Sequence, residues 1–178
     1  MTSVSVIGSG AWGTTLSQVL CDAGNDVLIW GRNHEVIAEI AKKRTNEKFI
    51  PGARLPENLN ATTEIEVALA AAEVIVLAVP AQTLRANLLN WKAFFPTNKP
   101  VISSLKGIEI QSNLRMSEVV RDCINFHVHV FTPSYVSPEV NAMHDRAVQE
   151  GVLVLNEMGV DPGIDHISAM EIIHRLKE

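Results

Sequence analysis

Residues 4–13 read Val-Ser-Val-Ile-Gly-Ser-Gly-Ala-Trp-Gly, and an amphipathic stretch of helical length follows them at once. A β-branched run is thus joined to a helix by the spacing G-x-G-x-x-G. Gly8 permits a tight turn, Gly10 lets a pyrophosphate approach the backbone, and Gly13 lets the helix pack closely on the strand. The helix start also offers free N–H groups and a positive end to an anion. The stretch therefore predicts a dinucleotide site, and a glycine turn without a ligand is the alternative.

The rest of the 178-residue chain alternates short apolar runs with amphipathic stretches. Continuously apolar runs are typical of a parallel sheet that helices cover on both faces. We therefore expect an α/β fold, a doubly wound, mainly parallel, Rossmann-like sheet in one domain over 1–178, with a long surface loop at Arg44–Asn60. The expected strands are 4–7, 27–30, 74–79, 101–104, 127–131 and 152–155, and the expected helices are 13–23, 34–43, 63–71, 82–90, 112–123, 137–149 and 165–176.

Composition excludes several classes of protein. The 47% of hydrophobic residues suits a packed core, and the net charge of −5 argues against a nucleic-acid partner. Because the longest apolar runs have strand length and the N-terminus lacks a secretion signal, we expect a cytoplasmic chain without a membrane partner. In that compartment Cys21 and Cys123 are expected to be buried free thiols.

The end of the second expected strand bears on which dinucleotide binds. A site that selects NAD usually has Asp or Glu about 20 residues after the glycines, where it binds the ribose 2′-hydroxyl. Here Arg32 follows the strand, and no carboxylate precedes Glu35. Arg32 can pair bidentately with a 2′-phosphate, which a carboxylate would repel. NADP(H) is therefore the expected cofactor, with NAD(H) as the alternative, and a solvated surface arginine is the other interpretation of Arg32.

Four stretches, 6–14, 28–32, 79–82 and 104–109, together resemble the N-terminal domain of bacterial NAD(P)-dependent glycerol-3-phosphate dehydrogenase. The specific features are a tryptophan inside the glycine loop and the run Lys-Gly-Ile-Glu, and the resemblance covers about residues 1–122. It implies an oxidoreductase that transfers hydride between NADPH and dihydroxyacetone phosphate. Because the family's catalytic lysine lies in a second domain without a counterpart here, we assign no catalytic residue and expect weak or no turnover.

The resemblance also implies contacts with the cofactor. Ala11 and Trp12 would line it, and Arg32 would lie beside its adenosine end. Lys106 would touch both the cofactor and a phosphorylated three-carbon substrate, whereas a solvent-facing lysine is the alternative without the resemblance. With the glycine loop included, the expected cofactor-binding residues are Gly8, Ser9, Gly10, Ala11, Trp12, Gly13, Arg32, Val79, Pro80 and Lys106.

The last third of the chain departs from that family. Residues 132–139 and 154–166, which include the run Asp-Pro-Gly-Ile-Asp-His, resemble saccharopine dehydrogenase of the glutamate-forming type. Besides Lys106, this resemblance implies that Ser134, Tyr135 and Asp161 bind substrate. We therefore expect a hybrid of a part at 1–125 and a part at 126–178, an engineered chimera in the first instance. A natural fusion and a divergent single family are the alternatives.

Several functions stay open at this point. A saccharopine reductase-like, NADP-dependent dehydrogenase and a chimera that only binds dinucleotide are the alternatives to the first interpretation. A homodimer is also compatible with the exposed ligand edge of the sheet. His127 and His129 alternate on an expected strand, but without a third ligand we expect no metal site. Asp161, Asp165 and His166 could form an acid–base cluster or simply cap a helix.

Overall fold

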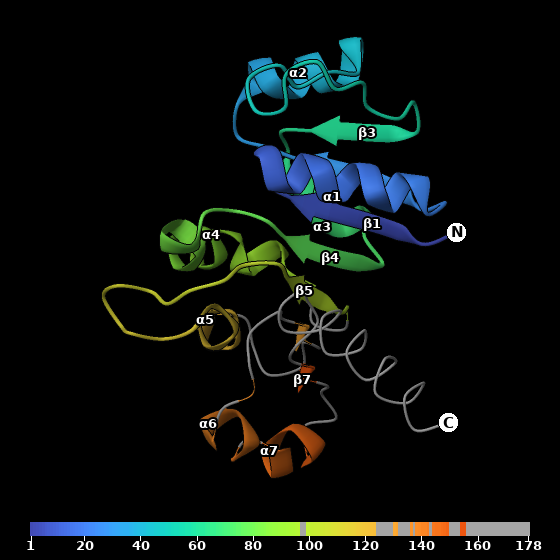
Figure 1. The fold of residues 1–178 in the computed structure, drawn as a ribbon. Helices are drawn as coiled ribbons and strands as arrows, with labels where there is room; N and C mark the ends of the chain where they lie inside the picture. Colours follow the sequence, from blue (N-terminus) through green and yellow to red (C-terminus); the bar gives the residue numbers. More distant parts are fainter. Residues whose placement is uncertain are drawn as a thin grey trace, which may run out of the picture.

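A computed structural model describes residues 1–96, 99–123, 130–131, 136, 138–142, 144–149 and 154–155. Its strands form one seven-stranded sheet in the order β3-β2-β1-β4-β5-β6-β7, shown in Figure 1, and every neighbouring pair is parallel. The expected doubly wound, Rossmann-like α/β fold is therefore confirmed. The strands are β1 (Ser3–Ile7), β2 (Asp26–Trp30), β3 (Leu59–Thr62), β4 (Val74–Leu77), β5 (Val101–Ser103), β6 (Val130–Phe131) and β7 (Val154–Leu155).

At least one helix lies between every two strands that are consecutive in the chain. The expected continuous helix over 137–149 is replaced by two short helices, and the expected helix at 165–176 lies outside the described residues. The helices are α1 (Ala11–Asp22), α2 (His34–Lys43), α3 (Ile65–Ala71), η1 (Ala81–Thr83), α4 (Leu84–Trp91), η2 (Lys92–Phe94), α5 (Met116–Cys123), α6 (Pro138–Asn141) and α7 (His144–Gln149).

Strand β1, with the sequence Ser-Val-Ser-Val-Ile, serves two hydrophobic clusters, one on each face of the sheet. Successive side chains of a strand point to opposite faces. Val4 and Val6 accordingly join the cluster that contains residues of α1 and α2, whereas Ile7 joins the cluster of α3, α4 and α5. The Ser5 hydroxyl, on the same face as Ile7, is buried and donates to the Ala68 carbonyl of α3 at 2.6 Å. Although serine and valine alternate in this strand, four of its five residues are buried, and the polar Ser5 side chain is accommodated by its hydrogen bond to α3.

The edge strand β3 was not expected from the sequence. Its residues, Leu-Asn-Ala-Thr, overlap the end of the expected surface loop at Arg44–Asn60 and give little strand signal. The strand forms because it pairs in parallel with β2, from Val27 against Leu59 to Trp30 against Thr62. Long-range pairing has overridden local preference here.

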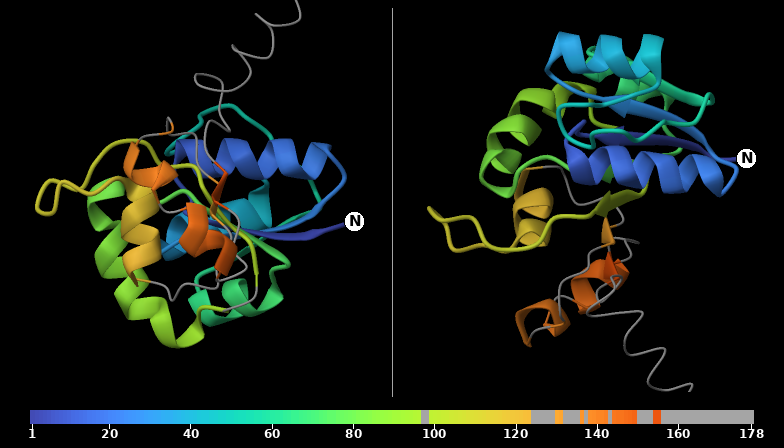
Figure 2. Two further views of the ribbon diagram at one scale, coloured as in Figure 1. Left: turned by 90° about the horizontal axis from the view of Figure 1, so that it is seen from below. Right: turned by 45° about the horizontal axis from the view of Figure 1, so that its top comes forward.

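The order of the strands reverses at β1, which pairs with β2 on one side and β4 on the other. Because all pairs are parallel, the carboxyl ends of β1, β2, β4 and β5 meet at one edge of the sheet. Ligands of open α/β sheets bind beyond this edge, at such a switch point. Both views of Figure 2 also show the loop between β5 and α5 extending away from the body of the molecule.

Two further expectations concern the state of the cysteines and the presence of membrane-spanning segments. Cys21 and Cys123 are buried and free, which confirms the interpretation of both as buried thiols. Within the residues that the structure describes, no helix has the length and apolar character needed to cross a membrane.

Candidate functional site

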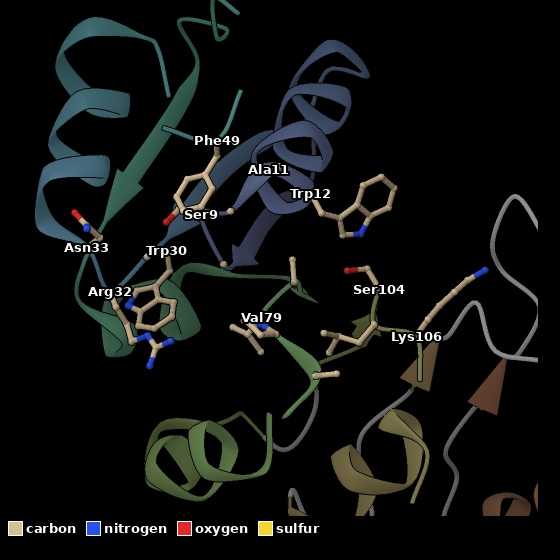
Figure 3. A pocket seen from close by; sticks show the side chains of 17 residues that line it. Ser9, Ala11, Trp12, Trp30, Arg32, Asn33, Phe49, Val79, Ser104 and Lys106 are labelled. Atoms are coloured by element: carbon tan, nitrogen blue, oxygen red, sulfur yellow. The ribbon is translucent and has the colours of Figure 1, made fainter. Parts of the chain in front are cut away.

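A cavity of about 520 Å³ opens at the carboxyl edge of the sheet (Figure 3). The loops that follow β1, β2, β4 and β5 supply most of its walls, so four segments far apart in sequence meet there. Its volume falls within the range of about 300–1,000 Å³ that is usual for small-molecule sites. Among its lining residues are all the expected cofactor-binding residues except Gly13: Gly8, Ser9, Gly10, Ala11, Trp12, Arg32, Val79, Pro80 and Lys106.

At two of the three glycines of the loop, the surrounding backbone leaves no room for a side chain. Gly8 has a φ of +135°, and a Cβ there would lie 2.4 Å from the Ala78 carbonyl oxygen. At Gly13, a Cβ would lie 1.9 Å from the Gly8 carbonyl oxygen. These two glycines let α1 and β4 approach the turn, so Gly13 acts through packing and does not line the cavity.

Gly10 has no such requirement. Its φ of −73° and ψ of −178° suit any residue, and a Cβ there would meet no atom within 4 Å. The space that a side chain at Gly10 would occupy is therefore open and belongs to the cavity. Any residue larger than glycine would fill it. A ligand that lies against the backbone at this point explains the glycine, as a pyrophosphate does in a dinucleotide site.

The N-terminus of α1 faces the same space. Gly10 is its N-cap and makes no side-chain capping bond, and the first turn holds no acidic residue. The first N–H groups of a helix lack partners within the helix, and their positive end attracts anions. The twelve-residue α1 thus presents an anion-binding end next to the open space at Gly10.

The charge of the cavity agrees with an anionic ligand. Arg32 and Lys106 both line it, and no Asp or Glu is among its described lining residues. This local excess of positive charge occurs in a chain whose net charge is −5. In Figure 3 the two cationic side chains lie at opposite ends of the cavity, with the glycine loop between them.

The end of β2 is held tightly against the glycine loop. A Cβ on Gly31 would lie 2.1 Å from the Ser9 Oγ, so the two segments are in direct contact. Asn33 then caps α2, since its Oδ1 accepts from the backbone N–H groups of Glu35 at 2.9 Å and Val36 at 3.0 Å. Between these two fixed points, Arg32 is exposed at the mouth of the cavity.

Lys106 is the third residue of the loop that follows β5, and its side chain is exposed. Gln82 of η1 fixes this loop at two points. Its Nε2 donates to the Ile108 carbonyl at 2.8 Å, and its Oε1 accepts from the Ile110 N–H at 3.0 Å. The backbone that carries Lys106 is therefore anchored to the segment that follows β4.

Sequence reasoning missed two residues of this region, Phe49 and Asn46. Phe49 lines the cavity with 40% of its surface exposed, and in Figure 3 its ring lies beside Ser9. Both residues belong to the non-periodic stretch at Arg44–Asn60, which gave no signal of a site. Trp30 packs edge-to-face on Trp91 with ring centroids 5.0 Å apart, and it also lines the cavity.

Other expected residues lie outside the part of the chain that the structure describes. The structure therefore places no side chain of the expected substrate contacts Ser134, Tyr135 and Asp161, nor of His127, His129, Asp165 and His166. Among the residues that it does describe, no group of three or more His, Cys, Asp or Glu side chains could hold a metal ion.

Comparison with known proteins identifies the family. The N-terminal domain of NAD-dependent glycerol-3-phosphate dehydrogenase matches residues 3–144. Glycerol-3-phosphate dehydrogenase [NAD(P)+] of Corynebacterium glutamicum is 46% identical over 122 residues, which are 68% of this chain and 37% of that protein. The enzyme of the same name from Corynebacterium diphtheriae is 49% identical over 119 residues, or 67% of this chain and 36% of that one. The chain thus spans little more than a third of the length of these relatives.

The fold is shared with solved structures as well. The crystal structure of glycerol-3-phosphate dehydrogenase from Coxiella burnetii gives a TM-score of 0.68 at 19% identity, covering 87% of this chain and 53% of that chain. The family match passes residue 126, where we expected a join, and continues to residue 144. Neither the family match nor these relatives support a saccharopine dehydrogenase segment or a chimera, so the division at 126 stays an untested prediction.

Proposed function

The chain belongs to the family of NAD-dependent glycerol-3-phosphate dehydrogenase N-terminal domains, and from this we propose that its cavity binds the dinucleotide of an oxidoreductase. The pyrophosphate would lie against Gly10, at the N-terminus of α1. The observation that carries this proposal is the open space at Gly10, a residue that neither backbone conformation nor packing requires to be glycine. The two cations of the cavity and its lack of carboxylates support the same assignment.

We propose that the cofactor contacts Phe49 and the nine expected residues that line the cavity: Gly8, Ser9, Gly10, Ala11, Trp12, Arg32, Val79, Pro80 and Lys106. Arg32, exposed at the mouth beyond β2, would pair with a ribose 2′-phosphate and so favour NADP(H) over NAD(H). The relatives are described as using NAD(P)+, which leaves the preference of this chain to be measured. Trp12, 55% exposed, and Val79 would cover the apolar surfaces of the cofactor.

The substrate proposal rests on Lys106. Its ammonium group, at the opposite end of the cavity from Arg32, would balance the phosphate of dihydroxyacetone phosphate and help to polarise the carbonyl that is reduced. When bound, the reduced nicotinamide supplies the hydride. In this proposal the residues of the cavity would position these partners, and efficient turnover would also require that water be excluded from the reacting atoms. The chain spans about 37% of the length of the C. glutamicum enzyme, and dinucleotide binding is the function that we propose for its cavity.

The test is a fluorescence titration of the purified chain with NADPH and, in parallel, with NADH. Saturable binding of either supports the proposal, and tighter binding of NADPH supports the role of Arg32. Absence of binding by a chain whose circular dichroism shows it to be folded would overturn the assignment. Oxidation of NADPH that depends on dihydroxyacetone phosphate then tests the substrate proposal separately.

A further inference from the structure

Asn46 lies beneath the glycine loop, although it belongs to the long segment between α2 and β3. Its side chain is fully buried. Its Nδ2 donates two hydrogen bonds, to the Ser9 carbonyl oxygen at 3.1 Å and to the Thr14 Oγ1 at 2.8 Å. The Thr14 hydroxyl in turn donates to the Gly10 carbonyl at 2.9 Å. One amide group thus holds two consecutive carbonyls of the turn, the first directly and the second through Thr14.

These bonds bear on the direction of the N–H groups at the cavity. In a trans peptide unit the C=O and the N–H point in opposite directions. A Ser9 carbonyl held toward Asn46 therefore turns the Gly10 N–H away from Asn46. The Gly10 carbonyl accepts from both the hydroxyl and the backbone N–H of Thr14, each at 2.9 Å, and these bonds fix the direction of the Ala11 N–H. Ser9, Gly10 and Ala11 all line the cavity, so the two N–H groups are turned toward the ligand space.

The backbone of Asn46 fixes a second wall of the same cavity. Its carbonyl oxygen accepts from the N–H groups of Phe49 at 3.1 Å and Ile50 at 2.9 Å. The turn that carries the Phe49 ring is therefore tied to the residue whose side chain holds the glycine loop. Through its side chain and its backbone, Asn46 links two cavity walls that come from separate parts of the sequence.

The burial of this amide has no explanation in packing. Within the described residues, the Asn46 Oδ1 is buried and has no hydrogen-bond partner. Burying a polar group with an unsatisfied atom is unfavourable, and an apolar side chain of similar size would avoid it. Such an apolar side chain would, however, lack the two hydrogen-bond donors of the Asn46 Nδ2 group, so these two hydrogen bonds account for an asparagine at this position.

We propose that Asn46 is a positioning residue of the dinucleotide site, which aims the N–H groups of Gly10 and Ala11 at the pyrophosphate. The inference rests on the proposed function and deepens it, because it names what holds the anion-binding turn in its binding geometry. Since the pyrophosphate is common to both dinucleotides, Asn46 affects the affinities for NADPH and NADH by the same factor. Arg32, in contrast, changes the ratio of the affinity for NADPH to the affinity for NADH.

The experiment replaces Asn46 with leucine, which has a similar shape but no donor. Asn87→Leu is the matched control: Asn87 is also buried, and its Nδ2 donates to Thr83 Oγ1 at 3.2 Å, but it does not line the cavity. We expect Asn46→Leu to raise the Kd for NADPH and NADH alike by about tenfold, the equivalent of roughly one hydrogen bond. Asn87→Leu should leave both Kd values unchanged, whatever it does to the melting temperature.

Nuclear magnetic resonance gives a readout that a purely structural role would not move. The backbone amide signals of Gly10 and Ala11 should shift in ligand-free Asn46→Leu and stay in place in Asn87→Leu. If Asn46→Leu fails to fold, Thr14→Val removes the relay to the Gly10 carbonyl and should raise both Kd values in the same way. An unchanged Kd in a folded Asn46→Leu, or an equal rise in Asn87→Leu, overturns the inference but leaves the proposed function intact. Failure of the unmodified chain to bind either dinucleotide overturns both.

Discussion

Arg85 of α4 donates from its Nε to both carboxylate oxygens of Glu109, at 3.0 and 2.9 Å. Glu109 belongs to the same loop after β5 as Lys106, and it also accepts a hydrogen bond from the Ser112 hydroxyl. The same guanidinium donates from its Nη1 to the Asp122 Oδ2 of α5 at 3.1 Å. This ion pair therefore fastens the loop after β5 to two helices on one face of the sheet, and it does so three residues after the lysine that we propose for the substrate.

The Arg85–Glu109 pair predicts a pH-dependent stability. The hydrogen bond from Ser112, followed by the contacts with Arg85, lowers the pKa of Glu109, while burial and, to a smaller extent, the Asp122 carboxylate act in the opposite direction. Because the pKa is lower in the folded chain, the pair stabilises the fold above about pH 4.3, the usual value for Glu. That contribution is lost as the pH falls through the folded-state pKa.

Glu109→Gln tests this dependence, since it keeps the shape and removes the charge. The melting temperature of the variant should lie below that of the unmodified chain at neutral pH, and the difference should shrink in acid. Glu57→Gln is the control, because Glu57 pairs with Arg54 at 3.7 Å on the surface, with both side chains more than three-quarters exposed. Exposed pairs contribute little. A difference between Glu109→Gln and the unmodified chain that stays constant with pH would contradict the prediction.

The two cysteines should be unreactive in the folded chain. Burial, with smaller contributions from Asp22 and Asp26, raises the pKa of Cys21 to about 11. Burial also raises the pKa of Cys123, although the Arg85 guanidinium opposes this. Only the thiolate reacts readily with alkylating agents. Mass spectrometry after treatment with iodoacetamide at mildly alkaline pH should show no modification without denaturant and two modified cysteines with it. Fast modification of either thiol in the native chain would refute the burial of that residue.

Local sequence was sufficient for the central part of this fold. The β-branched runs, the glycine spacing and the helix patterns each act over a few residues, so they indicate β1, α1 and β2 correctly. They also indicate the edge of the sheet at which both Arg32 and Lys106 lie, because parallel strands end on the same side. The structure brings these two residues to one cavity, although they lie far apart in the sequence.

The parts that sequence did not reveal depend on tertiary contacts. β3 is a strand because β2 lies beside it, whereas Asn60 and Ala61 within it are residue types that strands disfavour. Asn46 and Phe49 reach the site from a segment without periodicity, and Asn46 becomes informative only through its hydrogen bonds to Ser9 and Thr14. No count of apolar or turn-forming residues could have predicted which of the asparagines lies beneath the glycine loop.

Gly10→Val should abolish dinucleotide binding and leave the fold intact. The backbone at Gly10 is extended, so valine can adopt its conformation, and the new side chain enters only the open space of the cavity. Replacing a glycine at such a position also restricts the unfolded chain, which offsets part of any loss. We expect no binding of NADPH in a fluorescence titration and a melting temperature close to that of the unmodified chain.

Gly13→Val is the matched comparison for that experiment. Its Cβ would lie 1.9 Å from the Gly8 carbonyl oxygen, so this variant should lose stability as well as binding. Circular dichroism during thermal unfolding separates the two cases. Retention of the original NADPH affinity by a folded Gly10→Val would remove the glycine loop from the site.

Arg32→Glu should weaken the binding of NADPH more than that of NADH. The change places a carboxylate where we propose the 2′-phosphate of NADPH, whereas the 2′-hydroxyl of NADH can donate to a carboxylate. A lost charge-assisted hydrogen bond of about 1.5–3 kcal/mol corresponds to a rise in Kd of roughly ten- to a hundredfold. Parallel titrations with the two dinucleotides give the ratio directly. Arg54→Glu, at an exposed arginine outside the cavity, controls for the change in net charge and should leave that ratio unchanged. Equal losses of affinity for NADPH and NADH in Arg32→Glu would mean that Arg32 does not contact the 2′-phosphate. The proposed preference for NADP(H) would then be wrong. The proposed pyrophosphate site at Gly10 would be unaffected, because it does not depend on Arg32.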